Sequence, residues 1–294
     1  MAPTNKLSSP IAGCMRWGVW GVGYDTLQYR AMIELCIESG ITSFDHADIY
    51  GDYTTEAEFG EALKTSPSLR QEIQIITKCG IQLPCEQRPN YNFKAYNTSY
   101  QHIIQSVNQS LKNFHTDYLD VLLIHRPDPL LNPHEVARAV DELKKAGKIL
   151  QFGVSNFMPQ QTNALKRYTV IEYNQLEISI INLSPFVNGC LDNCIKHQII
   201  PMAWAPLGGG IFNDEGHPSF RSIVQKASTL SKKYCTGINQ ILIAFLLKHP
   251  AGVIPVMGTT KVDRLVQSKE AASIQLSNED WFQLYLASSG EELA

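Results

Sequence analysis

Short apolar runs rich in β-branched residues alternate with segments of helical periodicity along almost the whole chain. From Asp45 to Gly258, six steps from one predicted strand to the next cover 213 residues, about 35 each, which is the length of a βαβ unit. The runs are nearly continuous in apolar residues, as expected for strands buried on both faces. We expect strands at residues 11–17, 41–47, 73–79, 119–125, 149–155, 171–178, 199–205 and 253–257.

The segments between these strands place apolar residues at i, i+3 and i+4, as Ile103, Val107 and Leu111 do, which indicates amphipathic helices. We expect helices at residues 27–39, 99–114, 134–146, 159–168, 187–197 and 238–249. Residues 80–98 are interpreted as a long loop, and residues 278–288 as a final helix outside the repeating pattern.

Eight strands joined by crossover helices form either a closed barrel or an open doubly wound sheet. The open Rossmann sheet needs a G-x-G-x-x-G motif after the first strand. Gly18, Gly21 and Gly23 lie there, but Asp25 and Thr26 follow, so the third glycine is missing. We therefore predict an α/β fold, a (β/α)8 TIM barrel, as a single domain over residues 1–294.

The composition excludes several classes of protein. Lys and Arg number 25 against 28 Asp and Glu, and a net charge of −3 gives no general reason to bind nucleic acid or an anionic membrane. The odd number of cysteines, seven, is a poor disulfide framework and favours reduced thiols. Residues 1–9 lack the apolar stretch of a signal peptide, and the longest apolar run, 241–247, is far too short for a membrane span. We expect a soluble, cytoplasmic protein; its oligomeric state has no clear sequence signal.

Four reactive side chains lie at or just after the carboxyl ends of predicted strands, where barrel enzymes carry their active sites. They are Asp45, Tyr50, Lys78 and His125. A buried lysine and aspartate on neighbouring strands are expected to pair, because an isolated buried charge is costly. A cation beside the Tyr50 phenol is expected to lower its pKa, so that the tyrosine acts as a general acid. A neutral His125 would orient a substrate carbonyl by a hydrogen bond.

Each of these residues also has an ordinary interpretation, because strand-end aspartates often cap turns and lysines are usually solvated. Four of them together at strand ends favour an active site. A metal site is not expected. Asp45 and His46 point to opposite faces of a strand, and Cys190 and Cys194 lack a second pair of ligands with zinc spacing.

The chain carries the motifs FDHADIYG, TKCGI and LLIHRPDP. Through these motifs it resembles the aldo-keto reductase family, and within it a bacterial branch of predicted oxidoreductases, and the resemblance runs from Ile11 to about Leu286. The resemblance implies a (β/α)8 barrel that reduces an aldehyde or ketone with NADPH. Asp45, Tyr50, Lys78 and His125 match the catalytic tetrad, and Trp17, Tyr50 and His125 are expected to contact the small carbonyl substrate.

The resemblance also assigns the cofactor positions. Ser155 and Asn156 would hold the nicotinamide carboxamide with Gln175, Trp204 would stack on the ring, and Arg264 would pair with the 2′-phosphate. The remaining positions, for the pyrophosphate and the adenosine phosphate, are Pro206, Leu207, Gly208, Gly258, Thr259, Thr260 and Lys261. The chain departs from the family where many members carry a lysine for Gly258 and a Glu-Asn pair for Gln267-Ser268, so the preference for NADP over NAD is less strongly implied.

Two other functions remain open at this point. One is a non-catalytic NADP(H)-sensing subunit on the same fold, as in the potassium-channel β-subunits that the family includes. The other is a Schiff-base lyase with Lys78 as its nucleophile, although an Asp45 partner would keep that amine charged. Substrate choice is expected to depend on the loops at 80–98, 126–133 and 208–221.

Overall fold

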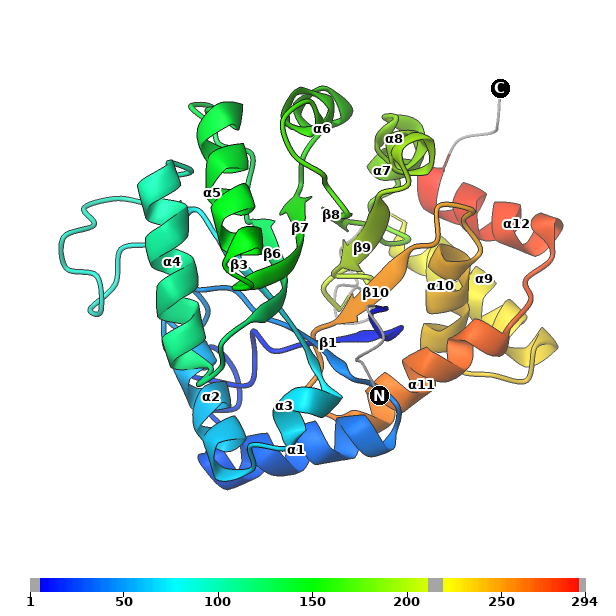
Figure 1. Cartoon of the computed structure of the whole chain (residues 1–294). Coiled ribbons are helices and arrows are strands. Elements are labelled where there is room, and N and C mark those ends of the chain that lie inside the picture. Colours follow the sequence, from blue (N-terminus) through cyan, green and yellow to red (C-terminus); the bar gives the residue numbers. More distant parts are fainter. Residues whose placement is uncertain (1–5, 211–218, 291–294) are drawn as a thin grey trace.

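The computed structural model describes residues 6–210 and 219–290. Eight parallel strands close into a barrel in the order β1-β10-β9-β8-β7-β6-β3-β2 (Figure 1). The strands are β1 (Ile11–Gly13), β2 (Ser43–Asp45), β3 (Gln74–Cys79), β6 (Leu119–Ile124), β7 (Ile149–Ser155), β8 (Tyr173–Glu177), β9 (Ile200–Trp204) and β10 (Ile254–Met257). The predicted (β/α)8 barrel is confirmed.

Helices surround the barrel on its outside (Figure 1). They are α1 (Thr26–Glu38), α2 (Thr55–Thr65), α3 (Leu69–Glu72), α4 (Tyr100–Asn113), α5 (Pro133–Lys145), α6 (Pro159–Lys166), α7 (Ser184–Val187), α8 (Cys190–His197), α9 (Phe220–Lys233), α10 (Ile238–Leu247), α11 (Val262–Glu270), the 3-10 helix η2 (Ala271–Ser273) and α12 (Asn278–Ser289). All six helices predicted between strands are present, and so is the final one.

Four details differ from the sequence-based expectations. The first strand ends at Gly13 rather than at residue 17, because the chain then turns repeatedly around Gly18 and Gly23. The predicted helix 187–197 is two helices, separated at Gly189 by a left-handed backbone with φ 83°. Helices α2, α3, α9 and α11 and the 3-10 helix η2 were not expected. The loop 80–98 carries a small antiparallel hairpin, β4 (Ile81–Gln82) and β5 (Ala95–Tyr96), and projects beyond α4 (Figure 1).

The core has one layer inside the barrel and a larger one between strands and helices. Inside, apolar side chains from alternate strand positions pack together, among them Ile11, Ile76, Val121, Leu123 and Met202. Between strands and helices, the inner faces of α4 and α5 supply the residues that the periodicity indicated, such as Val107 and Val140. This packing holds the strand ends rigidly, which is the condition for placing reactive side chains accurately.

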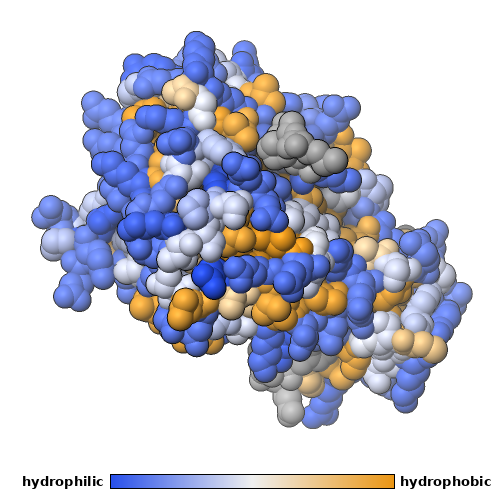
Figure 2. Space-filling view, turned by 60° about the horizontal axis from the view of Figure 1, so that its bottom comes forward, coloured by the Kyte–Doolittle hydropathy of each residue, from blue (hydrophilic) through white to orange (hydrophobic). Residues whose placement is uncertain are grey.

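The face of the molecule in Figure 2 is mostly hydrophilic, with hydrophobic residues in separate patches. Among the described residues, no helix combines the length and apolar character needed to cross a membrane. Several exposed apolar side chains belong to the segment between β1 and α1, namely Met15, Val19, Trp20 and Val22.

A buried ion pair joins α3 to the barrel, and it provides a test of the fold. Nη2 of Arg70 lies 2.8 Å from Oδ2 of Asp120, and the same oxygen accepts the Ile75 amide at 2.8 Å. Arg70→Met leaves this carboxylate buried without its cation, so we expect a loss of about 3–5 kcal/mol in the free energy of unfolding. Urea denaturation measures the loss. The double variant Arg70→Met/Asp120→Asn should recover part of it, and a loss below about 1 kcal/mol in the single variant would contradict this account.

Candidate active site

Three of the four predicted catalytic side chains meet directly at the carboxyl ends of β2 and β3. Nζ of Lys78 lies 2.8 Å from Oδ2 of Asp45, 3.1 Å from the Tyr50 hydroxyl and 2.7 Å from the carbonyl oxygen of His46. Strands β2 and β3 are hydrogen-bonded neighbours, so their register brings the ammonium and the carboxylate together. The ring of the fourth residue, His125, lies 6.1 Å from the Tyr50 ring, centroid to centroid, edge to face. The sequence-based expectation that these four groups converge is confirmed.

The charges of this group are buried and balance one another. Burial lowers the pKa of Lys78, but the Asp45 charge, the electrostatic interaction with the Tyr50 oxygen and the hydrogen bonds to both residues outweigh it, so the pKa of this lysine is raised overall. Lys78 therefore stays an ammonium ion. The other oxygen of Asp45, Oδ1, accepts a hydrogen bond from Nε2 of Gln175 at 2.7 Å.

The expected direction of the Tyr50 pKa is wrong for the protein alone. Burial raises the pKa of Tyr50, and the nearby Lys78 charge lowers it only in part. The physical reason is that a phenolate packed among protein atoms loses hydration, which one ammonium ion does not fully replace. Tyr50 thus keeps its proton and can donate it to an acceptor that binds there.

His125 is neutral, as the sequence indicated. Burial lowers the pKa of His125 well below its ordinary value, and the charges of Lys78, Arg126 and Lys94 lower it further. Its Nδ1 atom is buried without a hydrogen-bond partner among the described residues. Arg126 donates from Nη1 to the His125 carbonyl oxygen at 2.9 Å, and its guanidinium carbon lies 5.7 Å from the Trp204 ring centroid. Sequence reasoning missed Arg126, although it directly follows His125 in the motif.

Four of the predicted cofactor residues form one hydrogen-bonded chain across the ends of β7, β8 and β9. Nε1 of Trp204 donates to Oδ1 of Asn156 at 3.0 Å, and Nδ2 of Asn156 donates to Oγ of Ser155 at 2.9 Å. Oγ of Ser155 in turn donates to the Gln175 carbonyl oxygen at 3.0 Å. Gln175 has a partner that the spacing did not indicate, since its amide is bonded to Asp45. This chain fixes the Trp204 ring beside the tetrad.

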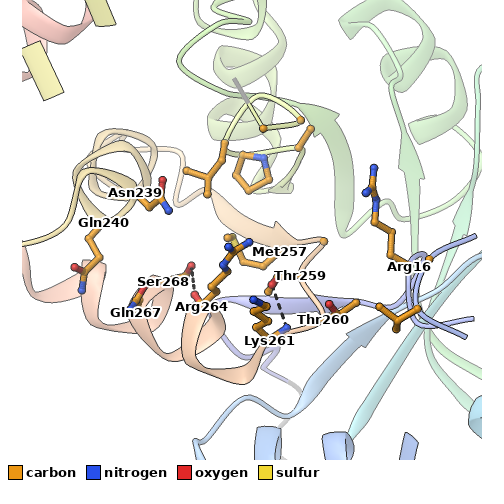
Figure 3. A pocket seen from close by; sticks show the side chains of 18 residues that line it. Arg16, Asn239, Gln240, Met257, Thr259, Thr260, Lys261, Arg264, Gln267 and Ser268 are labelled. Atoms are coloured by element: carbon orange, nitrogen blue, oxygen red, sulfur yellow. Dashed lines mark hydrogen bonds between the residues drawn. The ribbon is translucent and has the colours of Figure 1, made fainter. Parts of the chain in front are cut away.

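All the other predicted cofactor residues except Gly208 line a cavity of about 540 Å³ (Figure 3). The lining includes Pro206, Leu207, Gly258, Thr259, Thr260, Lys261 and Arg264, together with Gln267 and Ser268. Gly208 is not among the lining residues, whereas Gly209 and Gly210 are. All three glycines have a positive φ, so the backbone winds tightly along the cavity wall. Of the predicted loop 208–221, residues 211–218 lie outside the described residues.

Trp17 does not contact the site, which corrects the expectation that it binds substrate. Its side chain is 0% exposed and packs among the rings of Tyr24, Tyr29, Phe44 and Phe59. The aromatic neighbour of the tetrad is Trp20, whose ring centroid lies 6.1 Å from that of Tyr50 and whose side chain is 37% exposed. Both tryptophans lie in one glycine-rich turn, and the path of this turn decides that Trp17 points into the core and Trp20 toward Tyr50.

Three further side chains that the sequence analysis considered as metal ligands, His46, Cys190 and Cys194, are buried in the core. His46 points away from Asp45, as strand alternation predicted, and its ring packs edge-on against Phe59 and Phe114. Burial, followed by the Lys78 charge, lowers the pKa of His46 to about 3. Cys190 and Cys194 are buried free thiols.

A closed barrel with an Asp-Lys-Tyr network at the carboxyl ends of its strands, next to a cationic cavity, defines an enzyme of the (β/α)8 class. Comparison with known proteins specifies it further: residues 11–285 match the model of the aldo/keto reductase family. The chain belongs to this family and is an oxidoreductase.

Relatives and solved structures agree with this assignment. The chain is 41% identical to "Uncharacterized oxidoreductase YcsN" of Bacillus subtilis, over 100% of this chain and 98% of the relative. It is 38% identical to a "6-dehydroglucose reductase" of Agrobacterium fabrum, over 95% of each. An aldo/keto reductase from Klebsiella pneumoniae, solved in complex with NADP and acetate, shares the fold with a TM-score of 0.76 at 24% identity, over 95% of this chain and 90% of that one.

The depressed pKa values of the two buried histidines predict a result in titration. We expect the His125 and His46 rings to stay neutral from pH 8 down to pH 5.5, because both folded-state pKa values lie below the ordinary one. NMR spectra of protein with 15N-labelled histidine rings measure this, and the variant His125→Gln assigns the signal by its disappearance. A His125 signal that titrates with a midpoint above pH 6 would contradict the neutral imidazole.

Proposed function

We propose that the protein reduces an aldehyde or ketone to an alcohol, with NADPH as the hydride donor and Tyr50 as the general acid. The observation that carries the proposal is the contact of the Lys78 ammonium with both the Tyr50 hydroxyl, at 3.1 Å, and the Asp45 carboxylate, at 2.8 Å. A protonated phenol beside a fixed buried cation is suited to giving up its proton when negative charge develops on a neighbouring oxygen.

The cavity has the chemistry that a phosphorylated dinucleotide needs. Among its described lining residues are three cations, Arg16, Lys261 and Arg264, and no carboxylate. The glycine backbone on one wall allows close approach of a diphosphate, and Arg264 and Lys261 lie on the segment expected to hold a 2′-phosphate. Trp204 offers a fixed aromatic face beside the tetrad. These residues fit NADP(H), which supplies a hydride to the carbonyl carbon when bound.

The residues of the tetrad then have distinct tasks. Neutral His125 positions the carbonyl oxygen by a hydrogen bond, and Tyr50 transfers its proton to that oxygen as charge develops there. Lys78 stabilises the resulting phenolate and so counters part of the effect of burial on the Tyr50 pKa. Asp45, held by Gln175, keeps the lysine charged and in place. Trp20 lies beside the Tyr50 ring and Arg126 bonds the His125 carbonyl oxygen, so both are candidates for substrate contacts.

The environment of Lys78 argues against the Schiff-base alternative. A nucleophilic lysine needs a neutral amine, whereas the pKa of Lys78 is raised and its amine already has three hydrogen-bond acceptors. A non-catalytic NADP(H) sensor would share the cofactor cavity, so turnover of a carbonyl separates it from the enzyme. The carbonyl panel should include 6-dehydroglucose, since relatives with 38% and 32% identity bear the name of its reductase.

Removal of the Tyr50 hydroxyl tests the proposal directly. Tyr50→Phe keeps the ring and deletes the proton donor, so we expect kcat to fall about 100- to 10,000-fold. The dissociation constant of NADPH, measured by fluorescence titration, should stay within about twofold of the wild-type value.

A matched control is Tyr53→Phe, which deletes a hydroxyl that bonds the Leu83 amide outside the tetrad. This control should retain most of the activity. Normal turnover by Tyr50→Phe would exclude the tyrosine as the acid, and tight NADPH binding without turnover by the wild-type protein across the panel would favour the sensor.

Gly258 offers a test of the 2′-phosphate end of the cavity. A Cβ atom added at this exposed glycine meets no other atom within 4 Å, so a side chain fits there without displacing the backbone. Gly258→Lys adds a cation near Arg264, and we expect NADPH to bind about 2- to 5-fold more tightly while NADH changes less. Fluorescence titrations with both nucleotides measure the change, and Gly258→Gln is the uncharged control. An equal gain in affinity for NADPH and NADH would show that the added lysine does not act on the 2′-phosphate.

A further inference from the structure

The three cations of the cavity are divided between two walls. Lys261 and Arg264 lie at the start of α11, and Arg16 lies in the segment between β1 and α1 (Figure 3). The glycine wall that ends at Gly210 also borders this space. All three side chains are exposed, and none has a hydrogen bond or ion pair with another described residue. The sequence motifs and the family resemblance accounted for Lys261 and Arg264, but they left Arg16 without a role.

Arg16 is held by a compact turn rather than by a loose loop. The Arg16 carbonyl accepts the Val22 amide at 3.0 Å, and the Gly18 carbonyl accepts the amides of Gly21 and Gly23 at 2.9 and 3.1 Å. A Cβ atom at Gly21 would lie only 2.0 Å from the Arg16 carbonyl oxygen, so this close approach requires glycine. The backbone of Arg16 therefore has a defined position at the cavity wall.

The same turn is tied to the opposite wall of the cavity. Nε1 of the buried Trp17 ring donates to the Thr259 carbonyl oxygen at 3.4 Å, and the Tyr24 hydroxyl donates to the Thr260 carbonyl oxygen at 2.7 Å. Thr259 and Thr260 directly precede Lys261. Two hydrogen bonds thus set the distance between the wall that carries Arg16 and the wall that carries Lys261 and Arg264.

We propose that Arg16 binds the diphosphate bridge of the nicotinamide dinucleotide, and that its guanidinium closes the cavity opposite Gly209 and Gly210. This inference rests on the proposed cofactor function and assigns it a residue. Cations on two walls match a ligand with two separate anionic groups, and a guanidinium fork suits phosphate oxygens. The wall with Arg264 binds the phosphate at the adenosine end of the dinucleotide. Arg16 binds the diphosphate bridge, because it lies in the same segment as Trp20, whose ring is next to Tyr50.

The proposal is tested by comparing two nucleotides that differ in one anionic group. NADPH and NADH share the diphosphate bridge, but only NADPH carries the 2′-phosphate. Arg16→Gln should weaken the binding of both nucleotides equally, by about 10- to 100-fold, the usual effect of losing hydrogen bonds to a charged partner. Arg264→Gln should weaken NADPH by a similar factor and leave NADH within about twofold. Dissociation constants are measured by fluorescence titration at fixed salt.

Matched variants separate a binding role from a structural one. Arg30→Gln removes an exposed arginine on α1 that pairs with Glu34 and should change neither constant. Arg16→Lys should retain part of the affinity lost in Arg16→Gln, because it keeps the charge without the fork. Binding by Arg16→Gln should also depend less on salt than binding by the wild-type protein.

Each outcome decides one point. An unchanged affinity of Arg16→Gln for both nucleotides would overturn the proposal, and so would a loss confined to NADPH, which would place Arg16 at the 2′-phosphate. A loss for both nucleotides that Arg16→Lys does not relieve at all would indicate damage to the turn and would also overturn it. Failure of the wild-type protein to bind either nucleotide would instead reject the proposed function itself.

Discussion

The site depends on one buried charge, the ammonium of Lys78. A lysine in this position is tolerated only because Asp45 lies at 2.8 Å and two further oxygens accept its hydrogen bonds. Asp45 is in turn held by Gln175, which is 130 residues away in sequence and comes from β8 on the opposite side of the barrel. The network therefore joins β2, β3 and β8, and the closed barrel is what brings these strand ends to one place.

Burial shifts the pKa values of two titratable neighbours of this charge in opposite directions. It raises the pKa of Tyr50 and lowers that of His125, so both side chains are neutral in the protein alone. This is a coherent starting point for carbonyl reduction, because an acid must hold its proton until the oxygen needs it and an orienting imidazole must not compete for it. The lysine matters most at the moment when the phenol gives up its proton.

The segment between β1 and α1 links this site to the cofactor cavity. It supports Trp20 at the tetrad, Arg16 at the cavity wall, and two hydrogen bonds to the segment that follows β10. Backbone hydrogen bonds within the turn and the buried Trp17 ring give this segment a defined path. The position of the cofactor and the shape of the substrate space are thus coupled through one short stretch of chain.

The sequence by itself determined the barrel, because a strand-helix repeat of constant length with strands apolar on both faces has few other solutions. It also predicted that Asp45, Tyr50, Lys78 and His125 lie close together, since polar groups at the ends of buried strands share one edge of a barrel. Tertiary structure alone decided the rest: that Trp20 rather than Trp17 faces Tyr50, that Gln175 holds Asp45, and that Arg16 lies across a cavity from Arg264. Local periodicity contains no information on these contacts, because each depends on the path of a turn or on residues that are more than a hundred positions apart.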